Sequence, residues 1–158
     1  MEEKLFINRM VVKPEWIDHN GHMNVAFYVL AFDEATDAVY EQWGIGLDYP
    51  EREQCSVFTI GMNVDYLGEL FEGDPIIVKT QLVDWDGKRL HYFHEMVHEE
   101  TGQLSATNEC LVMNVSLESR RSAPFPPSVV EKLEQVWEKQ QDLKRPSRFA
   151  RTLEIRRK

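Results

Sequence analysis

The segment WIDHNGHMN, residues 16–24, places one carboxylate, two imidazoles and two amides within nine positions around a single glycine. Asp18, His19 and His22 are residue types that bind metal ions, and they also act as nucleophiles, general acids and general bases. Asn20 and Asn24 are typical of a turn and of a helix N-cap. The segment is therefore a metal site, a catalytic loop or a polar turn that begins a helix.

The rest of the chain disfavours a metal site. No second cluster supplies a further ligand at a recognised spacing, and the HExxH pattern is absent. The segment HYFHEMVH puts His91, His94 and His98 on a predicted strand, where His94 and His98 share one face and His91 lies on the other. We interpret these three as histidines of the sheet surface or of an interface, and we expect no metal and no other cofactor.

The position of the opening segment favours acyl chemistry, because a long helix is predicted to begin at Asn24. The first N–H groups of a helix lack partners, and the helix dipole adds positive charge there, so this end can polarise an acyl carbonyl or hold an oxyanion. Asp18 lies one tight loop earlier, where a carboxylate can act as nucleophile or as general base for water. Gly21 allows the backbone to approach a ligand closely. From spacing alone, a plain capped turn explains the segment equally well.

The predicted elements are one strand, a long helix, a run of strands and a last helix. Period-two alternation of Phe58, Ile60, Met62, Val64 and Tyr66 indicates a strand with one apolar face, and Asp-Gly at 86–87 indicates a hairpin. The predicted strands are 5–12, 56–68, 75–85, 88–100 and 104–118, and the predicted helices are 24–44 and 128–140.

Gly44 and Gly46 are expected to stop the first helix, whose apolar content predicts burial on more than one side. In the second helix we expect Ser128 to be the cap, with an apolar face of Val130, Leu133, Val136 and Trp137. The order of elements predicts an α+β fold in which one antiparallel sheet curls around the first helix. Its exposed edges favour pairing with a second copy of the chain.

Composition limits the class of protein. The 158 residues suffice for one domain, and a net charge of -9 argues against nucleic acid as a partner. No run approaches the roughly 20 apolar residues that span a bilayer, and Cys55 and Cys110 are best read as reduced cytoplasmic thiols. From Lys144 onward the chain holds seven Lys and Arg against one Glu, which we interpret as a solvated tail; a contact for an anionic partner is the alternative.

Known motifs exclude several enzyme classes and point to one family. There is no GxSxG elbow, P-loop or GxGxxG. The stretch WIDHNGHMNVAFYVLAFDEA resembles the Asp-type, 4-hydroxybenzoyl-CoA thioesterase-like group of acyl-CoA thioesterases. The matching motif positions are Asp18, Gly21, His22, Asn24, Tyr28 and Asp33. This resemblance implies a hotdog fold over residues 1–143, with 144–158 as a basic tail.

The same resemblance implies roles for individual residues. Asp18 would be the catalytic carboxylate, and the backbone N–H of Val25 would polarise the thioester carbonyl. His22, counted with the catalytic residues, and Asn24 would mainly shape the loop. Thr59 and Asn63, on a strand that usually lines the site, could orient water or be plain polar residues of the sheet.

A narrower resemblance concerns the substrate. The stretches PEWIDHNGHMN, ATDAVYEQWGIGLDY and KRLHYFHEM resemble thioesterase domains that are fused to, or encoded beside, L-carnitine dehydrogenase and that act on betainyl-CoA in carnitine metabolism. Aromatic faces recognise a trimethylammonium group, and the residues from which such a cage could be drawn are Trp16, Phe27, Tyr28, Trp43, Phe58 and Tyr66. Lys88, Arg89 or the basic tail would bind the anionic CoA.

The resemblance therefore implies a cofactor-free thioester hydrolase of the cytoplasm that acts on a CoA thioester and forms a homodimer or a dimer of dimers, without a membrane or nucleic-acid partner. Two alternatives stay open. One is a hydratase or dehydratase of the same fold, with His22 as the only candidate for its histidine. The other is a non-catalytic module that binds acyl-CoA.

Overall fold

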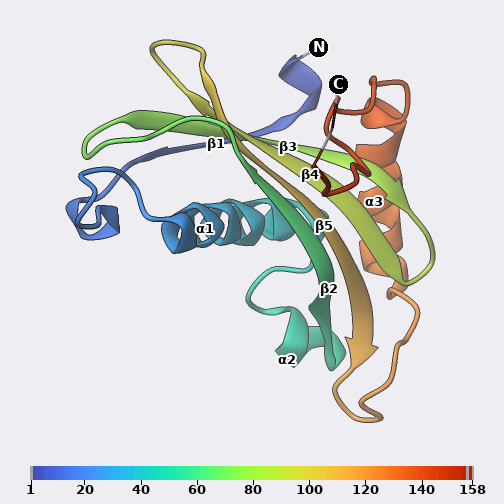
Figure 1. Cartoon of the computed structure of the whole chain (residues 1–158). Helices are drawn as coiled ribbons and strands as arrows, with labels where there is room; N and C mark the ends of the chain where they lie inside the picture. Colours follow the sequence, from blue (N-terminus) through green and yellow to red (C-terminus); the bar gives the residue numbers. More distant parts are fainter. Residues whose placement is uncertain (1, 156, 158) are drawn as a thin grey trace.

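A computed structural model of the chain describes residues 2–155 and 157. Five strands form one antiparallel sheet in the order β1-β3-β4-β5-β2. Their bounds are β1 Phe6–Val11, β2 Cys55–Tyr66, β3 Pro75–Trp85, β4 Arg89–His98 and β5 Leu104–Ser116. The sheet curves around the long helix α1, Val25–Trp43, and α3, Pro127–Gln140, lies toward one end of the sheet (Figure 1). The predicted α+β architecture, an antiparallel sheet wrapped around a central helix, is confirmed.

Helix α1 begins and ends as its sequence dictates. Asn24 is the N-cap, and Gly44 ends the helix with a φ of 78° that only glycine adopts without strain. One stripe of α1 is buried against the sheet, and its members are Tyr28, Ala31, Phe32, Ala35, Thr36, Val39 and Trp43. The expected burial on more than one side is wrong for this chain alone, because Val25 is 55% exposed and Leu30 is 41% exposed.

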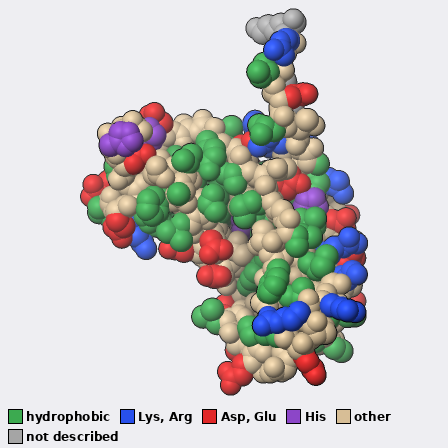
Figure 2. Space-filling view, turned by 60° about the horizontal axis from the view of Figure 1, so that its bottom comes forward, with side chains coloured by type: hydrophobic (Ala, Val, Ile, Leu, Met, Phe, Trp, Pro, Cys, Tyr) green, Lys and Arg blue, Asp and Glu red, His purple; other side chains and the backbone are tan. Residues whose placement is uncertain are grey.

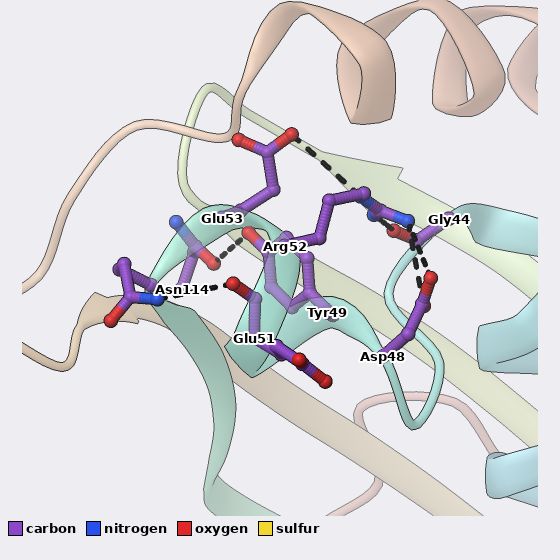
Figure 3. A network of polar contacts seen from close by, with 8 residues as sticks. Gly44, Asp48, Tyr49, Glu51, Arg52, Glu53 and Asn114 are labelled. Atoms are coloured by element: carbon purple, nitrogen blue, oxygen red, sulfur yellow. Dashed lines mark hydrogen bonds and ion pairs between the residues drawn. The ribbon is translucent and has the colours of Figure 1, made fainter.

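A short helix that the sequence analysis did not predict follows α1. This helix, α2, spans Tyr49–Glu53 and is too short to show a helical period. The Tyr49 hydroxyl donates to Asn114 Oδ1 on β5 (2.5 Å), and Arg52 donates to the Gly44 carbonyl (2.6 Å), so α2 is fastened to both the sheet and the end of α1 (Figure 3).

The cap of α3 also differs from the prediction. Its N-cap is Pro126, which offers no side-chain hydrogen bond, and Ser128 lies inside the helix. Proline at the first helical position, Pro127, needs no N–H partner there, so the helix can begin without a polar cap.

Strand β2 lies at an edge of the sheet and is irregular. Its pairing with β5 shifts between Thr59 and Gly61, which marks a bulge at Ile60. A one-residue shift reverses the faces on which the following side chains lie. The prediction of one continuous apolar face along β2 is therefore wrong.

The C-terminal segment is packed on the outer face of the sheet as far as Arg151. The Ala150 N–H donates to Glu109 Oε1 on β5 (2.8 Å), and Arg148 Nε donates to Asp65 Oδ2 on β2 (2.6 Å). Arg151 also pairs with Asp65. The expectation of a solvated tail is wrong for this stretch, because Arg148 and Arg151 both pair with Asp65, which lies far away in the sequence.

No helix among the described residues has the length and apolar character needed to cross a membrane.

Candidate functional site

Backbone hydrogen bonds close the loop that carries Asp18. Ile17 and Met23 form an antiparallel bridge, and the Gly21 N–H donates to the Asp18 carbonyl (3.0 Å). Gly21 has a φ of 82°, in the left-handed region that favours glycine. The Met23 N–H donates to the Leu70 carbonyl (2.7 Å), which ties the loop to the segment after β2. The backbone therefore fixes the point from which the Asp18 side chain projects.

One side chain couples Asp18 to the start of α1. Asn24 Nδ2 donates to Asp18 Oδ2 (2.9 Å), while Asn24 Oδ1 accepts from the Ala26 N–H (3.0 Å). The Asn20 N–H donates to Asp18 Oδ1 (2.8 Å). The Val25 N–H donates to no residue in the described part of the chain, so it is available to a ligand beside the held carboxylate.

These hydrogen bonds favour the charged form of Asp18. The bond from Asn24 Nδ2, followed by the bond from the Asn20 N–H, lowers the pKa of Asp18 below its ordinary value. Asp18 is therefore ionised at neutral pH. An ionised carboxylate is therefore held by the residue that caps a helix, and the first N–H of that helix has no partner among the described residues.

Two tyrosines lie against the first turn of α1. The Tyr66 hydroxyl donates to the Val25 carbonyl (3.2 Å), and the Tyr28 hydroxyl donates to the Gly68 carbonyl (3.0 Å). Their rings meet edge to face with centroids 5.3 Å apart. Tyr66 is 46% exposed whereas Tyr28 is 4% exposed, so Tyr66 offers an accessible aromatic ring next to Val25.

His22 and Trp16 lie near Asp18 but face other groups. His22 Nδ1 donates to the Met23 carbonyl (3.2 Å), and its Nε2 lies 3.9 Å from Glu69. Trp16 is 2% exposed and stacks on Phe27 in the core, with ring centroids 6.3 Å apart. Trp16 is therefore a core residue that supports the loop.

The bulge in β2 separates its three candidate residues. Residues opposite one another in an antiparallel pair lie on one face of the sheet. Thr59 pairs with Val112, which is buried on the side of α1, whereas Asn63 pairs with Glu109, which contacts the C-terminal segment on the outer face. Phe58 alternates with Thr59 and so also faces outward. Only Thr59 of these three shares a face with α1.

A groove with a volume of about 320 Å³ runs between α1 and strands β2 and β5. It begins at Ala26 in the first turn of α1, and its walls include Val29, Leu30 and Met62. Figure 2 shows hydrophobic side chains spread over one face of the molecule, with acidic side chains among them. The lining of the groove also includes polar residues, which are Asp33, Thr36, Thr59, Tyr92 and Asn108.

The sequence analysis missed Thr36 and Asn108 as residues of this groove. Each is a polar residue within an element whose neighbours are mostly apolar, and each is at least 92% buried. A polar residue at an inward position is the only sequence signal that could have found them.

His94 is buried at the back of this region, so its assignment to the sheet surface or an interface is wrong. The Thr36 hydroxyl donates to the Phe32 carbonyl (2.9 Å) and accepts from His94 Nε2 (2.8 Å). His94 Nδ1 therefore accepts from the Thr80 hydroxyl (2.7 Å). Burial lowers the pKa of His94 to about 3, so the imidazole is neutral and this row of hydrogen bonds is fixed.

Carboxylates cluster along α1 beyond its first two turns. Asp33, Glu34, Asp37 and Glu41 lie on a helix that contains no Lys or Arg. Burial, together with the neighbouring acids, raises the pKa of Asp37. Cations are therefore attracted to this side of the helix.

The basic candidates for CoA lie elsewhere on the chain. Arg89 pairs with Asp86 (2.5 Å) in the hairpin after β3, whereas the Asp18 loop adjoins the segment before β3. The length of β3 separates these ends by roughly 30 Å. Arg148 and Arg151 hold Asp65 on the outer face of edge strand β2. No group of His, Cys, Asp or Glu among the described residues is arranged to hold a metal ion.

Similarity to known proteins extends over most of the chain. A family model described as the thioesterase-like superfamily matches residues 12–133. A betainyl-CoA thioesterase from Pseudomonas aeruginosa is 38% identical over 155 residues, which cover 97% of this chain and 96% of the relative. An L-carnitine dehydrogenase/betainyl-CoA thioesterase from Ruegeria pomeroyi is 36% identical over 84% of this chain and 26% of its own length.

Solved structures share the whole fold. A Staphylococcus aureus protein solved in complex with CoA superposes with a TM-score of 0.91 at 32% identity, over 96% of both chains. A thioesterase described as putative, from Pseudomonas putida, superposes with a TM-score of 0.83 at 32% identity, over 97% of this chain and 98% of that one.

Proposed function

The chain belongs to the thioesterase-like superfamily, and on that premise we propose that Asp18 and the Val25 N–H are the groups with which it hydrolyses a small acyl-CoA. That the chain is an acyl-CoA thioesterase, a hotdog-fold thioester hydrolase, follows from the family match and from the relatives that span its length. The residues that act and the acyl group are the proposed part.

The observation that carries the assignment is the double role of Asn24. The same side chain caps α1 and holds the Asp18 carboxylate, so the distance between the carboxylate and the helix start is fixed before substrate binds. Such preorganisation is what transition-state stabilisation requires. A hydratase would need an Asp/His pair, and the His22 ring instead contacts Met23 and Glu69.

The reaction follows from this arrangement. The thioester carbonyl oxygen accepts from the Val25 N–H, and the negative charge that develops on it is stabilised by the helix start. The ionised Asp18 either attacks the carbonyl carbon directly or removes a proton from an attacking water. If Asp18 attacks, the carbon–sulfur bond breaks, the CoA thiolate leaves and takes up a proton, and water then cleaves the anhydride between the acyl group and Asp18. If water attacks, Asp18 accepts its proton, the carbon–sulfur bond breaks, and the CoA thiolate takes up that proton. Either route consumes one water and releases the acyl group as a carboxylic acid.

Asn24→Asp tests the link between Asn24 and the carboxylate. The variant keeps an N-cap acceptor but removes the donor to Asp18 and adds a like charge, so the pKa of Asp18 should rise. Because the ionised form is active, the acid limb of the kcat/KM profile should move to higher pH by about one unit or more.

Asn20→Asp is the matched control for that variant. It also adds a negative charge near Asp18, but the donor from position 20 is the backbone N–H, which it keeps. Its acid limb should move less. Identical limbs in the wild type and in Asn24→Asp would contradict the link.

The proposed acyl group is small, and betainyl-CoA is the first substrate to test because a relative with this name is 38% identical over almost the whole chain. The exposed Tyr66 ring beside Val25 supports a cationic acyl group, since aromatic faces attract cations. The test is CoA-thiol release from a panel of acyl-CoA esters that includes betainyl-CoA. No thiol release from any member would contradict the proposed function.

We also propose that two copies pair along edge strand β2. Phe58, Ile60 and Met62 are 44% to 51% exposed there. A long exposed apolar edge strand is either an interface or a site of aggregation. Ile60→Lys should convert a dimer to a monomer in light scattering. Leu153→Lys, which replaces an apolar residue that is 87% exposed in the C-terminal segment, should leave the mass unchanged. A monomeric wild type would contradict this pairing.

A further inference from the structure

The C-terminal strap, which we define as residues 144–151, lies across the outer face of the sheet and ends at edge strand β2. On its way it passes over β4, where Phe149 lies against His91 with ring centroids 4.5 Å apart. It also passes over β5, where the Ala150 N–H donates to Glu109 Oε1 (2.8 Å). The strap is therefore attached to several strands, and its last contacts fall on a strand that lines the groove.

Two arginines of the strap hold β2 near its end. Arg148 Nε donates to Asp65 Oδ2 (2.6 Å), and Arg151 pairs with Asp65 Oδ1. Arg151 also donates to the Val64 carbonyl (3.2 Å). The side chains of Asp65 and Arg151 are 11% and 15% exposed, so water and salt screen this pair less than they screen an exposed one. The strap therefore holds both a side chain and the backbone of β2, beyond residues 58–62, through which we propose that two copies pair.

Tyr66 follows Asp65 directly and touches the start of α1. Its hydroxyl donates to the Val25 carbonyl (3.2 Å). Tyr66 is 46% exposed, so packing surrounds only part of the ring, and its position depends on the backbone on either side of it. After Tyr66 the backbone is tied to β5, because the Leu67 N–H donates to the Ser105 carbonyl (2.9 Å). Before Tyr66, the ion pairs of the strap add to the pairing of β2 with β5.

We propose that Arg148 and Arg151 are positioning residues for thioester hydrolysis. They act through Asp65 and Tyr66 on the first residue of α1. The proposal rests on the function proposed above, in which the Val25 N–H polarises the thioester carbonyl. An edge strand has a neighbour on one side only, so without the ion pairs the end of β2 opens more readily and Tyr66 leaves the Val25 carbonyl. The helix start is then less well ordered at the place where the oxyanion forms.

The variant Arg148→Gln/Arg151→Gln tests the proposal. Its kcat for the ester that the wild type hydrolyses fastest should be about tenfold lower, because the oxyanion is held less precisely. Its KM should change by less than about twofold, since the oxyanion exists only in the transition state. Asp65→Asn weakens the same ion pairs from the other side and should also lower kcat, so it decides the matter if the first variant does not fold. A wild-type kcat in these variants overturns the proposal.

A double-mutant cycle shows whether the strap acts through the Tyr66 hydroxyl. Tyr66→Phe removes the hydrogen bond to the Val25 carbonyl and should itself lower kcat. Adding Arg148→Gln/Arg151→Gln to Tyr66→Phe should lower kcat by less than about a further twofold, because the link is already broken. Losses that multiply in full overturn the proposal, since the arginines would then act by another route.

Asp86→Asn is the matched control. Asp86 accepts from Arg89 Nε (2.8 Å) in the hairpin between β3 and β4, so this variant also breaks an aspartate–arginine pair and should also lose stability. Its kcat should equal that of the wild type, because the length of β3, roughly 30 Å, separates the hairpin from the Asp18 loop. An equal loss of kcat in Asp86→Asn overturns the proposal, because destabilisation alone would then explain the effect.

A measurement without turnover separates this inference from the proposed function. The chain labelled with fluorotyrosine gives a fluorine NMR resonance for Tyr66, which Tyr66→Phe identifies. In Arg148→Gln/Arg151→Gln this resonance should move toward that of free fluorotyrosine, whereas Asp86→Asn should leave it in place. If the wild type hydrolyses esters but Arg148→Gln/Arg151→Gln keeps its kcat, the inference fails and the hydrolase stands. If no ester is hydrolysed, the proposed function fails, and an unmoved resonance then overturns the positioning of Tyr66 as well.

Discussion

Asp18→Asn is expected to lower kcat for acyl-CoA hydrolysis by about a thousandfold or more, with little change in the affinity for the ester. The amide is close in size to the carboxylate, so the loop and the helix cap should survive. It can neither attack the thioester carbon effectively nor accept a proton from water. The measurement is steady-state release of the CoA thiol, together with a melting curve to confirm folding.

Glu15→Gln is the matched control. Glu15 is an exposed carboxylate in the 3-10 turn just before the loop. The same chemical change there should leave kcat unchanged. Full activity in Asp18→Asn would remove Asp18 from the mechanism, and a comparable loss in Glu15→Gln would indicate a general charge effect.

A single turnover in ¹⁸O-labelled water distinguishes the two roles open to Asp18. If water attacks directly, the first acid released carries the label. If Asp18 attacks and water then cleaves the anhydride at the Asp18 carbonyl carbon, the acid receives an unlabelled oxygen from Asp18 and the label enters the side chain, so label in the side chain identifies the nucleophilic route. Mass spectrometry of the acid and of the peptide that contains Asp18 reads both outcomes.

The second large effect is on stability in acid and originates at His94. Its pKa is about 3 in the folded protein against 6.5 for an ordinary histidine, because burial disfavours the imidazolium. Below pH 6.5 the unfolded chain therefore binds a proton that the folded chain does not, and stability is lost as the pH falls from 6.5 toward 3. His94 alone should cost roughly 2 kcal/mol between pH 7 and pH 5.

His94→Gln isolates this contribution. Glutamine keeps a donor and an acceptor for Thr36 and Thr80 but cannot titrate, so the free energy of unfolding should depend less on pH over this window. The absolute stability should fall, because the ring that stacks on Phe32 with centroids 5.6 Å apart is lost. Urea unfolding at pH 7, 6 and 5 measures the slope.

The control for His94→Gln lies on the same strand. His91 occupies the outer face of β4, where its Nε2 lies 2.7 Å from Glu109. His91→Gln removes an imidazole that contacts neither Thr36 nor Thr80, so comparing the two variants separates loss of the buried ring from loss of any histidine on this strand. If His94→Gln retained the full slope, the buried neutral imidazole would not be the source of the acid sensitivity.

Local signals accounted for the elements that frame the site. Asn24 and Gly44 mark the ends of α1 in the sequence and in the structure, because capping depends on hydrogen bonds and dihedral angles of a few adjacent residues. The strands were predictable from alternation and from the Asp-Gly hairpin. The short helix α2 and the Pro126 cap were not, since they depend on contacts with distant residues such as Asn114 or on the absence of a cap bond.

Two errors have a common physical origin. The bulge at Ile60 turned Phe58 away from α1, and no local pattern marks where a strand takes in an extra residue. His94 was assigned to the surface because histidine is usually polar and exposed. Its burial depends on Thr36 and Thr80, which come from other elements and satisfy both ring nitrogens.

By itself, the sequence determined the Asp18 loop, the helix that follows it and the family to which both belong, because turn, cap and motif are properties of neighbouring residues. Only the tertiary structure decided that Asn24 holds Asp18 at the helix start, and that the bulge in β2 leaves Thr59, and neither Phe58 nor Asn63, on the face of the sheet that α1 covers. The reason is that side-chain hydrogen bonds and the face on which a strand residue lies depend on the three-dimensional surroundings of each residue. The neighbouring residues in the sequence do not determine those surroundings.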